Sequence, residues 1–424
     1  MQADINELIE KAKQAKMASK KLASVPTAVK NEALMAVAQA LLDKEDIILH
    51  NNEKDYKEAE AGGMSASMLD RLMLNSARIK GISEDVKTVA KLPDPVGEVM
   101  EERTLANGLG LTKRRVPLGV IGALYESRPN VTVDISVLCL KAGNAVVLRG
   151  GKESYRSNLA LAGTVQEAVY RNGIPGGSVQ FIESTDRSLV DNMLKLKEYI
   201  DLIIPRGGEG LIKFVRDNAA MAVVAGGIGV CHTYIDKTAD QKKAAAIVYN
   251  AKVQRPTVCN ALDSVLVDKD IAAGFLPLVA KELAKAGVEM RCDNRALDIL
   301  KNIGGLKVKP ATEEDWGKEF LALIAAIKVV DSLDEALDHI DRYGSGHSEA
   351  ILSEDAKSIE RFLNEVDAAC VYANASTRFT DGSQFGMGAE IGISTQKFHA
   401  RGPMALREIT SYKWCIRGEG QVRP

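Results

Sequence analysis

Cys259 is the residue of this sequence whose type and setting best suit nucleophilic chemistry. It lies in the segment VQRPTVCNA (residues 253–261), just before an apolar run at 262–267 that is typical of a strand. A thiol attacks as its thiolate, and nearby positive charge lowers the pKa of the thiol. Lys252 and Arg255 supply such charge locally. The segment alone also fits a small buried cysteine with no chemical role.

Length and composition exclude several classes of protein. The 424 residues are enough for two or three domains. The net charge of −2 argues against a nucleic-acid-binding protein, which would be expected to carry a strongly basic surface. No stretch has the length and apolar character of a membrane span, and the first thirty residues do not resemble a signal peptide. The six cysteines are scattered without a C-x-x-C pair, so we expect no metal site and a cytoplasmic, reducing location.

The elements that must position Cys259 are two series of alternating strands and helices. Residues 1–91 form a helical region, because apolar residues recur there every three or four positions. From residue 116 onward, strands and helices alternate on both sides of the pair Gly226-Gly227, which indicates parallel, doubly wound sheets. We therefore predict an α/β fold with two such domains, formed by residues 1–97 with 116–227 and by residues 228–398.

A β-hairpin is predicted between the helical region and the first series. Asn107-Gly108 is a strong signal for a two-residue turn, and residues 98–115 alternate weakly around it. The hairpin is charged and has little apolar face, so it needs another surface to lie against. The tail at residues 405–424 contains a final strand that suits pairing with the hairpin of a neighbouring subunit. We therefore expect a small oligomerisation element and a homo-oligomer.

Two cationic glycine loops follow predicted strands. Residues 206–208 open a helix, and the N–H groups at the start of a helix can bind phosphate. Residues 149–152 lie at the carboxyl end of another strand, the edge at which open α/β sheets bind ligands. Each loop also fits an ordinary strand-to-helix turn, and the G-x-G-x-x-G pattern is not in place. Together they favour a phosphorylated nucleotide cofactor, whose ribose 2′-phosphate would meet Arg149 or Lys152. The predicted cofactor-binding residues are Arg149, Gly150, Gly151, Lys152, Arg206, Gly207 and Gly208.

Longer motifs give the sequence a resemblance to a known family. The order of several short motifs resembles that of the aldehyde dehydrogenase superfamily. These motifs are PLGV, RPN, AGNAVVLR, a glycine-rich turn, Gly-Gly and Cys259. Four longer segments are more closely similar to the γ-glutamyl phosphate reductase family within this superfamily. They are YESRPNVT (125–132), QRPTVCNA (254–261), YGSGHSEAI (343–351) and NASTRFTDG (374–382). The resemblance implies an aldehyde-dehydrogenase-like fold, with a cofactor-binding first domain and a catalytic second domain.

The resemblance also assigns roles to three residues. Cys259 matches the nucleophile, and Asn130 matches the asparagine whose amide joins the cysteine N–H in an oxyanion hole. Glu319 falls where the superfamily places a glutamate on the nicotinamide ribose. The residues beside it, Leu321-Ala322-Leu323, depart from the family pattern, and a solvated carboxylate is the alternative. The implied cofactor is NADPH, or NADP in the reverse direction, and no metal is implied.

One departure from the superfamily is informative. Hydrolytic aldehyde dehydrogenases carry a glutamate two residues before the Gly-Gly pair, and this glutamate activates the water that hydrolyses the thioester. Here that position is Val224. An enzyme that exchanges a thioacyl group with phosphate must not hydrolyse it, so the missing base favours acyl-phosphate chemistry.

Four polar residues are candidates for holding the substrate. Arginine pairs bidentately with carboxylates, so Arg378 and Arg401 suit an α-carboxylate. Either arginine could equally form an interdomain ion pair. Ser394 and Thr395 lie close to glycines in the sequence and could donate to the same carboxylate.

The resemblance therefore implies an NADPH-dependent reduction of L-glutamyl 5-phosphate to L-glutamate 5-semialdehyde and phosphate. This is the second step of proline biosynthesis from glutamate, and it proceeds through a thioacyl intermediate on Cys259. A functional association with glutamate 5-kinase is also implied. Two alternatives stay open. One is a related oxidoreductase that acts on another acyl phosphate or an aldehyde. The other is a binding protein with a dead site, against which Cys259 and Asn130 argue.

Overall fold

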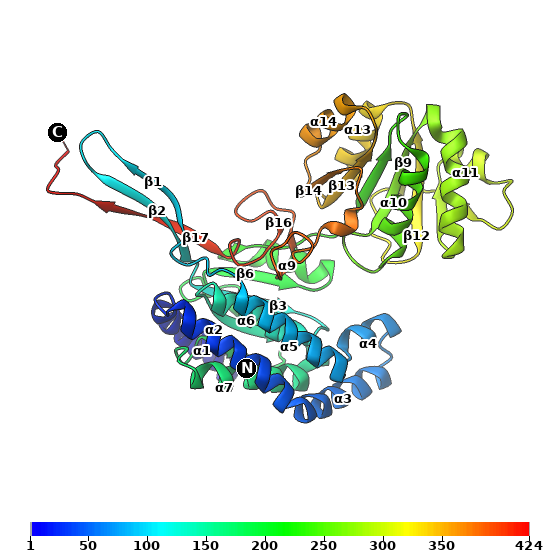
Figure 1. Cartoon of the computed structure of the whole chain (residues 1–424). Coiled ribbons are helices and arrows are strands. Elements are labelled where there is room, and N and C mark those ends of the chain that lie inside the picture. The colour runs from blue at the N-terminus through cyan, green and yellow to red at the C-terminus, as the bar shows by residue number, and fades with distance from the viewer. Residues whose placement is uncertain (1, 424) are drawn as a thin grey trace. The chain divides into compact units, whose positions relative to one another are not determined.

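The computed structural model describes residues 2–423, which divide into two compact units (Figure 1). The first unit contains the chain up to Gly226, Gly386–Gly392 and the C-terminal part from Met404. The second contains Gly227–Phe385 and Ile393–Pro403. Each unit is built on a parallel sheet with helices, so the predicted α/β class is confirmed. No helix among residues 2–423 is long and apolar enough to cross a bilayer.

The main sheet of the first unit has five parallel strands in the order β5-β4-β3-β6-β7. β3 is buried along its whole length, as a parallel strand covered on both faces requires. The chain runs outward from β3 to β5 and then returns to β6 on the other side of β3. Ligands of such sheets bind outside the carboxyl ends of the strands where the order reverses. The strands are β3 (Val120–Tyr125), β4 (Ala145–Gly150), β5 (Val179–Phe181), β6 (Leu202–Arg206) and β7 (Ala222–Val223).

Helices cover both faces of this sheet. On one face Leu8, Met193 and Val215, from three different helices, share a core with Val147 of β4. The helices of this face are α1 (Gln2–Leu22), α8 (Ser188–Met193) and α9 (Glu209–Asn218). The other face carries α6 (Asn130–Lys141) and α7 (Tyr155–Arg171), against which pack α2 (Thr27–Asp43), α3 (Glu45–Ala61) and α5 (Ser76–Lys91). α4 (Ala66–Leu72) packs against α3. The helical region predicted for residues 1–91 is confirmed.

The predicted hairpin is present, but the expected partner of the tail is wrong. β1 (Val99–Thr104), β2 (Gly110–Pro117) and β17 (Thr410–Arg417) form an antiparallel sheet in the order β1-β2-β17, and Figure 1 shows the tail strand beside the hairpin. β17 therefore pairs with β2 of its own chain. The turn closes through the N–H of Leu105, which donates to Leu109, so the loop is longer than the two residues predicted. Gly108 supplies the positive φ that this turn needs.

The second unit has a seven-stranded parallel sheet in the order β11-β10-β12-β9-β8-β13-β14. Successive side chains of a strand point to opposite faces, and in β9 Val265 and Val267 join one core while Leu266 joins the other. The strands are β8 (Cys231–Ile235), β9 (Leu262–Asp268), β10 (Glu289–Cys292), β11 (Lys307–Pro310), β12 (Ile324–Val330), β13 (Ser348–Leu352) and β14 (Cys370–Ala373). The helices are α10 (Gln241–Val253), α11 (Lys269–Lys285), α12 (Asn294–Leu300), α13 (Leu333–Tyr343) and α14 (Ala356–Glu365). β15 (Ile393–Ser394) and β16 (Gly402–Pro403) form a small separate ladder.

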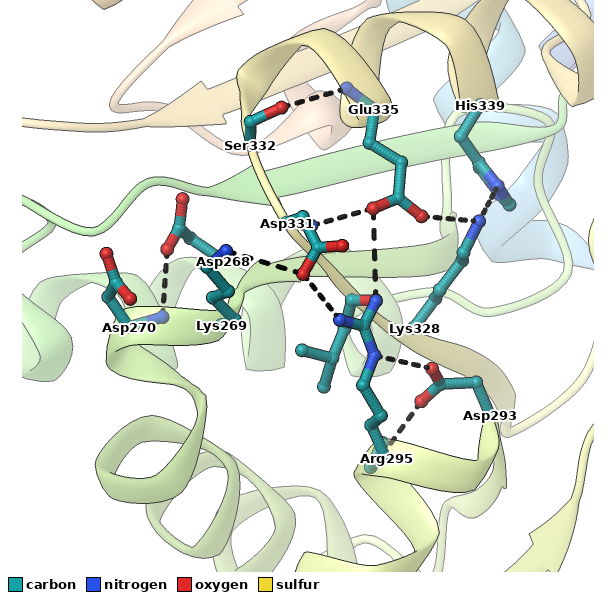
Figure 2. A network of polar contacts seen from close by, with 12 residues as sticks. Asp268, Lys269, Asp270, Asp293, Arg295, Lys328, Asp331, Ser332, Glu335 and His339 are labelled. Atoms are coloured by element: carbon teal, nitrogen blue, oxygen red, sulfur yellow. Dashed lines mark hydrogen bonds and ion pairs between the residues drawn. The ribbon is translucent and has the colours of Figure 1, made fainter.

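The carboxyl ends of three neighbouring strands of this sheet are occupied by helix caps (Figure 2). Asp268, at the end of β9, accepts an N–H at the start of α11, at 2.9 Å. Asp293, after β10, accepts an N–H at the start of α12, at 2.8 Å. Ser332, after β12, accepts an N–H at the start of α13, at 3.4 Å. Each cap satisfies a helix N–H that has no partner within the helix.

Arg295 joins these strand ends into one network (Figure 2). Its guanidinium lies 2.8 Å from Asp331 and donates to the carbonyl of Val329, and Asp293 and Glu335 lie within 3.9 Å of it. Cys259 precedes β9 and therefore lies at the opposite, amino end of the same sheet. The edge at which open sheets ordinarily bind ligands is thus filled by structural contacts in this unit.

We therefore expect Arg295→Ala to affect stability and not turnover. Loss of its charge-assisted bond to the Val329 carbonyl should lower the free energy of unfolding by about 1 kcal/mol, because the group is half exposed. Turnover should stay within about twofold, since no reacting group lies at this edge. Urea denaturation and steady-state assays check this. Lys285→Ala, which removes an exposed ion pair with Glu282 on α11, is the control. A large loss of turnover in the Arg295 variant would contradict the assignment.

Candidate functional site

The backbone around Cys259 is held by a very close contact with the segment that leads into β8. A Cβ atom built on Gly229 would lie 1.6 Å from the carbonyl oxygen of Cys259, so no side chain fits at position 229. The thiol of Cys231 lies 3.3 Å from the same oxygen and donates to it. Cys259 itself is half-buried in a turn between α10 and β9. The backbone of this turn therefore has a fixed course, and Cys259 is partly exposed on it.

Asn260 fixes the other side of this turn. Its amide Nδ2 donates to the carbonyl of Thr380 at 2.9 Å, and its own carbonyl accepts from the Thr377 hydroxyl at 2.8 Å. The guanidinium of Arg378 donates to the amide oxygen of Asn260. With a further bond from Nδ2 to the Arg378 carbonyl at 3.4 Å, Asn260 makes four hydrogen bonds to the segment 377–380. This contact between Asn260 and the segment 377–380 was not predicted from the sequence.

Two arginines lie at or against the turn that carries Cys259. Arg378 also donates to Gln254, at 2.8 Å, from the segment before Cys259. Burial lowers the pKa of Arg378, and the charge of Arg255 lowers it further, whereas a thiolate at Cys259 acts in the opposite direction. Arg378 is therefore a cation within electrostatic range of the Cys259 thiol, and Arg255 lies near Arg378. The sequence analysis expected Lys252 in this role, but Lys252 is fully buried and its ammonium lies 3.3 Å from Asp263.

Glu319 lies against the same segment that supports Cys259. Its carboxylate accepts the N–H of Gly229 at 3.0 Å. The sequence analysis left open a solvated carboxylate at this position. The half-buried side chain is instead bound to the backbone two residues before β8, within the second unit.

The candidates for substrate binding occupy three different settings. Arg378 lies in the segment 377–380 and contacts the turn that carries Cys259, as described above. Arg401 forms an ion pair with Asp367 at 2.8 Å within its own unit. Ser394 is buried in β15, and its hydroxyl accepts the N–H of Gln396 at 3.3 Å. The Thr395 hydroxyl lies close to Gly227, 3.3 Å from the position that a Cβ atom on this glycine would take.

The first unit contains a cavity of about 1000 Å³ at the carboxyl ends of β3, β4 and β6. Of the seven predicted cofactor-binding residues in the two glycine loops, four line it: Arg149, Gly151, Lys152 and Gly208. The other three, Gly150, Arg206 and Gly207, are not among the lining residues. A Cβ on Gly150 would meet the Asn158 side chain, and the guanidinium of Arg206 lies against Gly392. The two glycine loops thus meet at one cavity, but only part of each loop lines it.

Cations gather at this cavity. Arg149 donates to the carbonyls of Thr185 and Asp186, at 3.3 and 3.1 Å, and its pKa is lowered first by burial and then by Arg187. Arg187 and Lys152 also line the cavity. Arg187 was not predicted from the sequence, because it lies in a turn after β5 and belongs to no motif. Three carboxylates, those of Glu126, Glu153 and Asp191, line the cavity as well. The three basic side chains and the helix start beside them can contact the phosphates of a ligand.

A carboxylate already lies at that helix start. Glu126 follows β3, lines the cavity and accepts the N–H of Gly208 at 3.0 Å, immediately before α9. Anions are stabilised at this position by the unpaired N–H groups of the helix. The α9 N-terminus is therefore an anion-binding position in this structure.

Asn130 is the first residue of α6, and its amide is bound within the helix. Its Nδ2 donates to the Asp134 carboxylate at 2.8 Å, one turn further along. Val224, which stands where hydrolytic relatives carry a glutamate, is buried and donates its N–H to Ile203 next to the short strand β7. Asn130 and Val224 belong to the first unit.

Comparisons with known proteins agree with this arrangement. The sequence profile of the aldehyde dehydrogenase family matches residues 1–298. The γ-glutamyl phosphate reductase of Dehalococcoides mccartyi strain CBDB1 is 61% identical over 423 residues and covers 100% of both chains. That of Caldanaerobacter subterraneus subsp. tengcongensis is 55% identical over 413 residues, covering 97% of this chain and 99% of the relative.

A solved structure extends the similarity to the fold. The crystal structure of γ-glutamyl phosphate reductase from Thermotoga maritima has a TM-score of 0.96 and 50% sequence identity, and the match covers 99% of this chain and 100% of that one. An acetylating aldehyde dehydrogenase from Geobacillus thermoglucosidasius, 18% identical with a TM-score of 0.69, shares the fold across 100% of this chain and 98% of its own. This chain therefore belongs to the aldehyde dehydrogenase family and, within it, to the γ-glutamyl phosphate reductases.

Proposed function

We propose that this oxidoreductase reduces L-glutamyl 5-phosphate to L-glutamate 5-semialdehyde and phosphate with NADPH, the second step of proline biosynthesis from glutamate. The observation that carries the proposal is the turn around Cys259: a half-buried cysteine, a backbone fixed by Gly229 and the Arg378 guanidinium within electrostatic range of the sulfur. The names of relatives 61% and 55% identical to this chain support the substrate.

In the first chemical step the Cys259 thiolate attacks the carbonyl carbon of the acyl phosphate. A C–S bond forms, the C–O bond to phosphate breaks, and phosphate leaves with its electron pair. Arg378 and Arg255 favour the thiolate before attack and attract the phosphate group. The Asn130 amide and the Cys259 N–H stabilise the negative oxygen of the tetrahedral species.

In the second step the thioacyl group is reduced. NADPH, when bound, supplies the hydride that adds to the thioacyl carbon. The same two donors stabilise the resulting oxyanion, which collapses to the aldehyde and returns the electron pair to the sulfur of Cys259. Val224 places no carboxylate where hydrolytic relatives activate water. The thioacyl group is therefore protected from hydrolysis until reduction.

The cavity of the first unit fits the cofactor. Gly151 and Gly208 let phosphates approach the backbone, and Arg149, Lys152 and Arg187 suit the 2′-phosphate that distinguishes NADPH from NADH. We assign Arg206, Gly207 and Gly150 to the support of this site, because they lie in the same loops without lining the cavity. Glu319 is assigned to the nicotinamide ribose, since it lies on the segment that contacts Cys259.

For the substrate α-carboxylate we retain Arg401, Ser394 and Thr395 as candidates. Arg401 is held by Asp367 and so keeps a defined direction. Ser394 and Thr395 lie in and beside the β15–β16 ladder, which also contains Gly402 next to Arg401.

We also propose a homo-oligomer that uses the three-stranded antiparallel sheet. Large apolar side chains remain exposed on these strands, which is the usual mark of a protein interface. They are Val99, Met100, Tyr412, Trp414 and Ile416.

Replacing the nucleophile tests the proposal most simply. Cys259→Ser should lower kcat by at least about a thousandfold, because a serine hydroxyl ionises far less readily than a thiol. Cys415→Ser, on the tail strand, should leave kcat unchanged. The assay follows NADP reduction with pyrroline-5-carboxylate, the cyclised semialdehyde, and added phosphate. Turnover that did not require phosphate would contradict acyl-phosphate chemistry.

The cofactor assignment gives a separate prediction. Lys152→Ala should weaken binding of NADPH about tenfold, since it removes one charge-assisted contact to a phosphate, and should hardly change binding of NADH. Lys197→Ala, at an exposed position outside the cavity, serves as the matched control. Fluorescence titration of both cofactors measures the effect. Equal weakening of NADPH and NADH by the Lys152 variant would place the 2′-phosphate elsewhere.

A further inference from the structure

The amide of Asn130 is held by one acidic side chain. Asn130 begins α6, directly after Pro129, and its Nδ2 donates to the Asp134 carboxylate at 2.8 Å. Residues four apart lie one above the other on a helix, so this bond needs no long-range partner. An amide nitrogen carries two N–H donors. One is used by Asp134, and the direction of the second is fixed by the first.

Asp134 lies in a setting that suits this task. Burial raises the pKa of its carboxyl to about 7, and the nearby charge of Asp85 acts in the same direction. The bond from Asn130 and the charges of Arg206 and Arg128 oppose this rise. Asp85 belongs to α5, which packs against α6, and Arg206 ends β6. The Asp134 carboxylate is half-buried on α6, and there it accepts an N–H of the Asn130 amide.

We propose that Asp134 is a positioning residue that orients the Asn130 amide, so that the amide presents its second N–H, and not its oxygen, to the oxyanion of the reaction. The inference rests on the proposed function of Asn130. An asparagine amide that loses its acceptor can turn by 180°, which exchanges its N–H₂ and C=O ends. An amide oxygen in that place would repel the developing negative charge instead of stabilising it.

The surroundings of Asp134 predict a dependence of stability on pH. A raised pKa means that the folded protein favours the protonated acid, so this contribution is fully present below about pH 4 and is lost as the pH rises through about 7. Between pH 5 and 8 the urea midpoint of the native protein should therefore fall relative to that of Asp134→Asn, which does not titrate. Parallel pH profiles would show that the carboxyl is not held in this environment.

The decisive experiment is a double-mutant cycle on kcat. Asn130→Ala should lower kcat about a hundredfold, as expected for the loss of one oxyanion donor. Asp134→Ala should lower kcat at least about tenfold while the KM values for both substrates stay within about threefold, because the effect appears only in the transition state. In the Asn130→Ala background, Asp134→Ala should change kcat by less than about twofold.

Three further variants make the result specific. Asp134→Asn keeps an acceptor oxygen and should retain most of the native activity. Asp134→Leu has a similar volume without an acceptor and should show the loss of kcat expected for Asp134→Ala. It replaces the alanine variant in the test if Asp134→Ala does not fold. Asp85→Asn changes a charge near Asp134 without contacting Asn130 and should stay within twofold of the native protein.

The outcomes separate this inference from the proposed function. The positioning role is wrong, and the proposed function stands, if Asn130→Ala lowers kcat but Asp134→Ala and Asp134→Leu do not. The same holds if Asp134→Ala lowers kcat equally in the native and the Asn130→Ala background. If Asn130→Ala itself keeps full activity, both the oxyanion assignment and this inference fail. Activity in Cys259→Ser would instead overturn the proposed function.

Discussion

The contact between Gly229 and the carbonyl of Cys259 is the constraint on which the candidate active site depends. The two backbones approach so closely that only glycine fits, and this contact fixes the course of the thiol turn. The same segment receives Glu319 through the Gly229 N–H and leads directly into β8. Asn260 secures the opposite side of the turn. The backbone contacts thus fix the position of Cys259, and the residue remains partly exposed for reaction.

The two sheets place their chemistry at different edges. In the first unit, the cavity lies at the carboxyl ends of β3, β4 and β6, as expected for an open α/β sheet whose strand order reverses between β3 and β6. In the second unit, the carboxyl ends carry helix caps and the Arg295 network, and Cys259 lies at the amino end. The general rule for ligands of open sheets therefore locates the cavity but not the thiol.

The sequence allowed the fold class, the helical N-terminal region, the hairpin and the grouping of two glycine loops to be predicted, because these depend on local periodicity and on strand order. Pairings between distant residues were not predictable in this way. Lys252 is close to Cys259 in sequence, yet its charge is used by Asp263. Arg378, considered for the substrate, contacts Asn260, and Arg187 joins the cavity from a turn with no motif. The tail strand pairs within its own chain because β2 has an open edge beside it. Asp134 was missed although its spacing from Asn130 is visible in the sequence.

The central claim is that Cys259 carries the acyl group and that water does not remove it. The most direct measurement is peptide mass spectrometry of protein quenched in acid after incubation with pyrroline-5-carboxylate and NADP without phosphate. We expect a glutamyl thioester on the peptide that contains Cys259, formed together with a single burst of NADPH and lost when phosphate is added. Continued NADPH formation without phosphate, or turnover with the Cys259 peptide unmodified, would contradict the account.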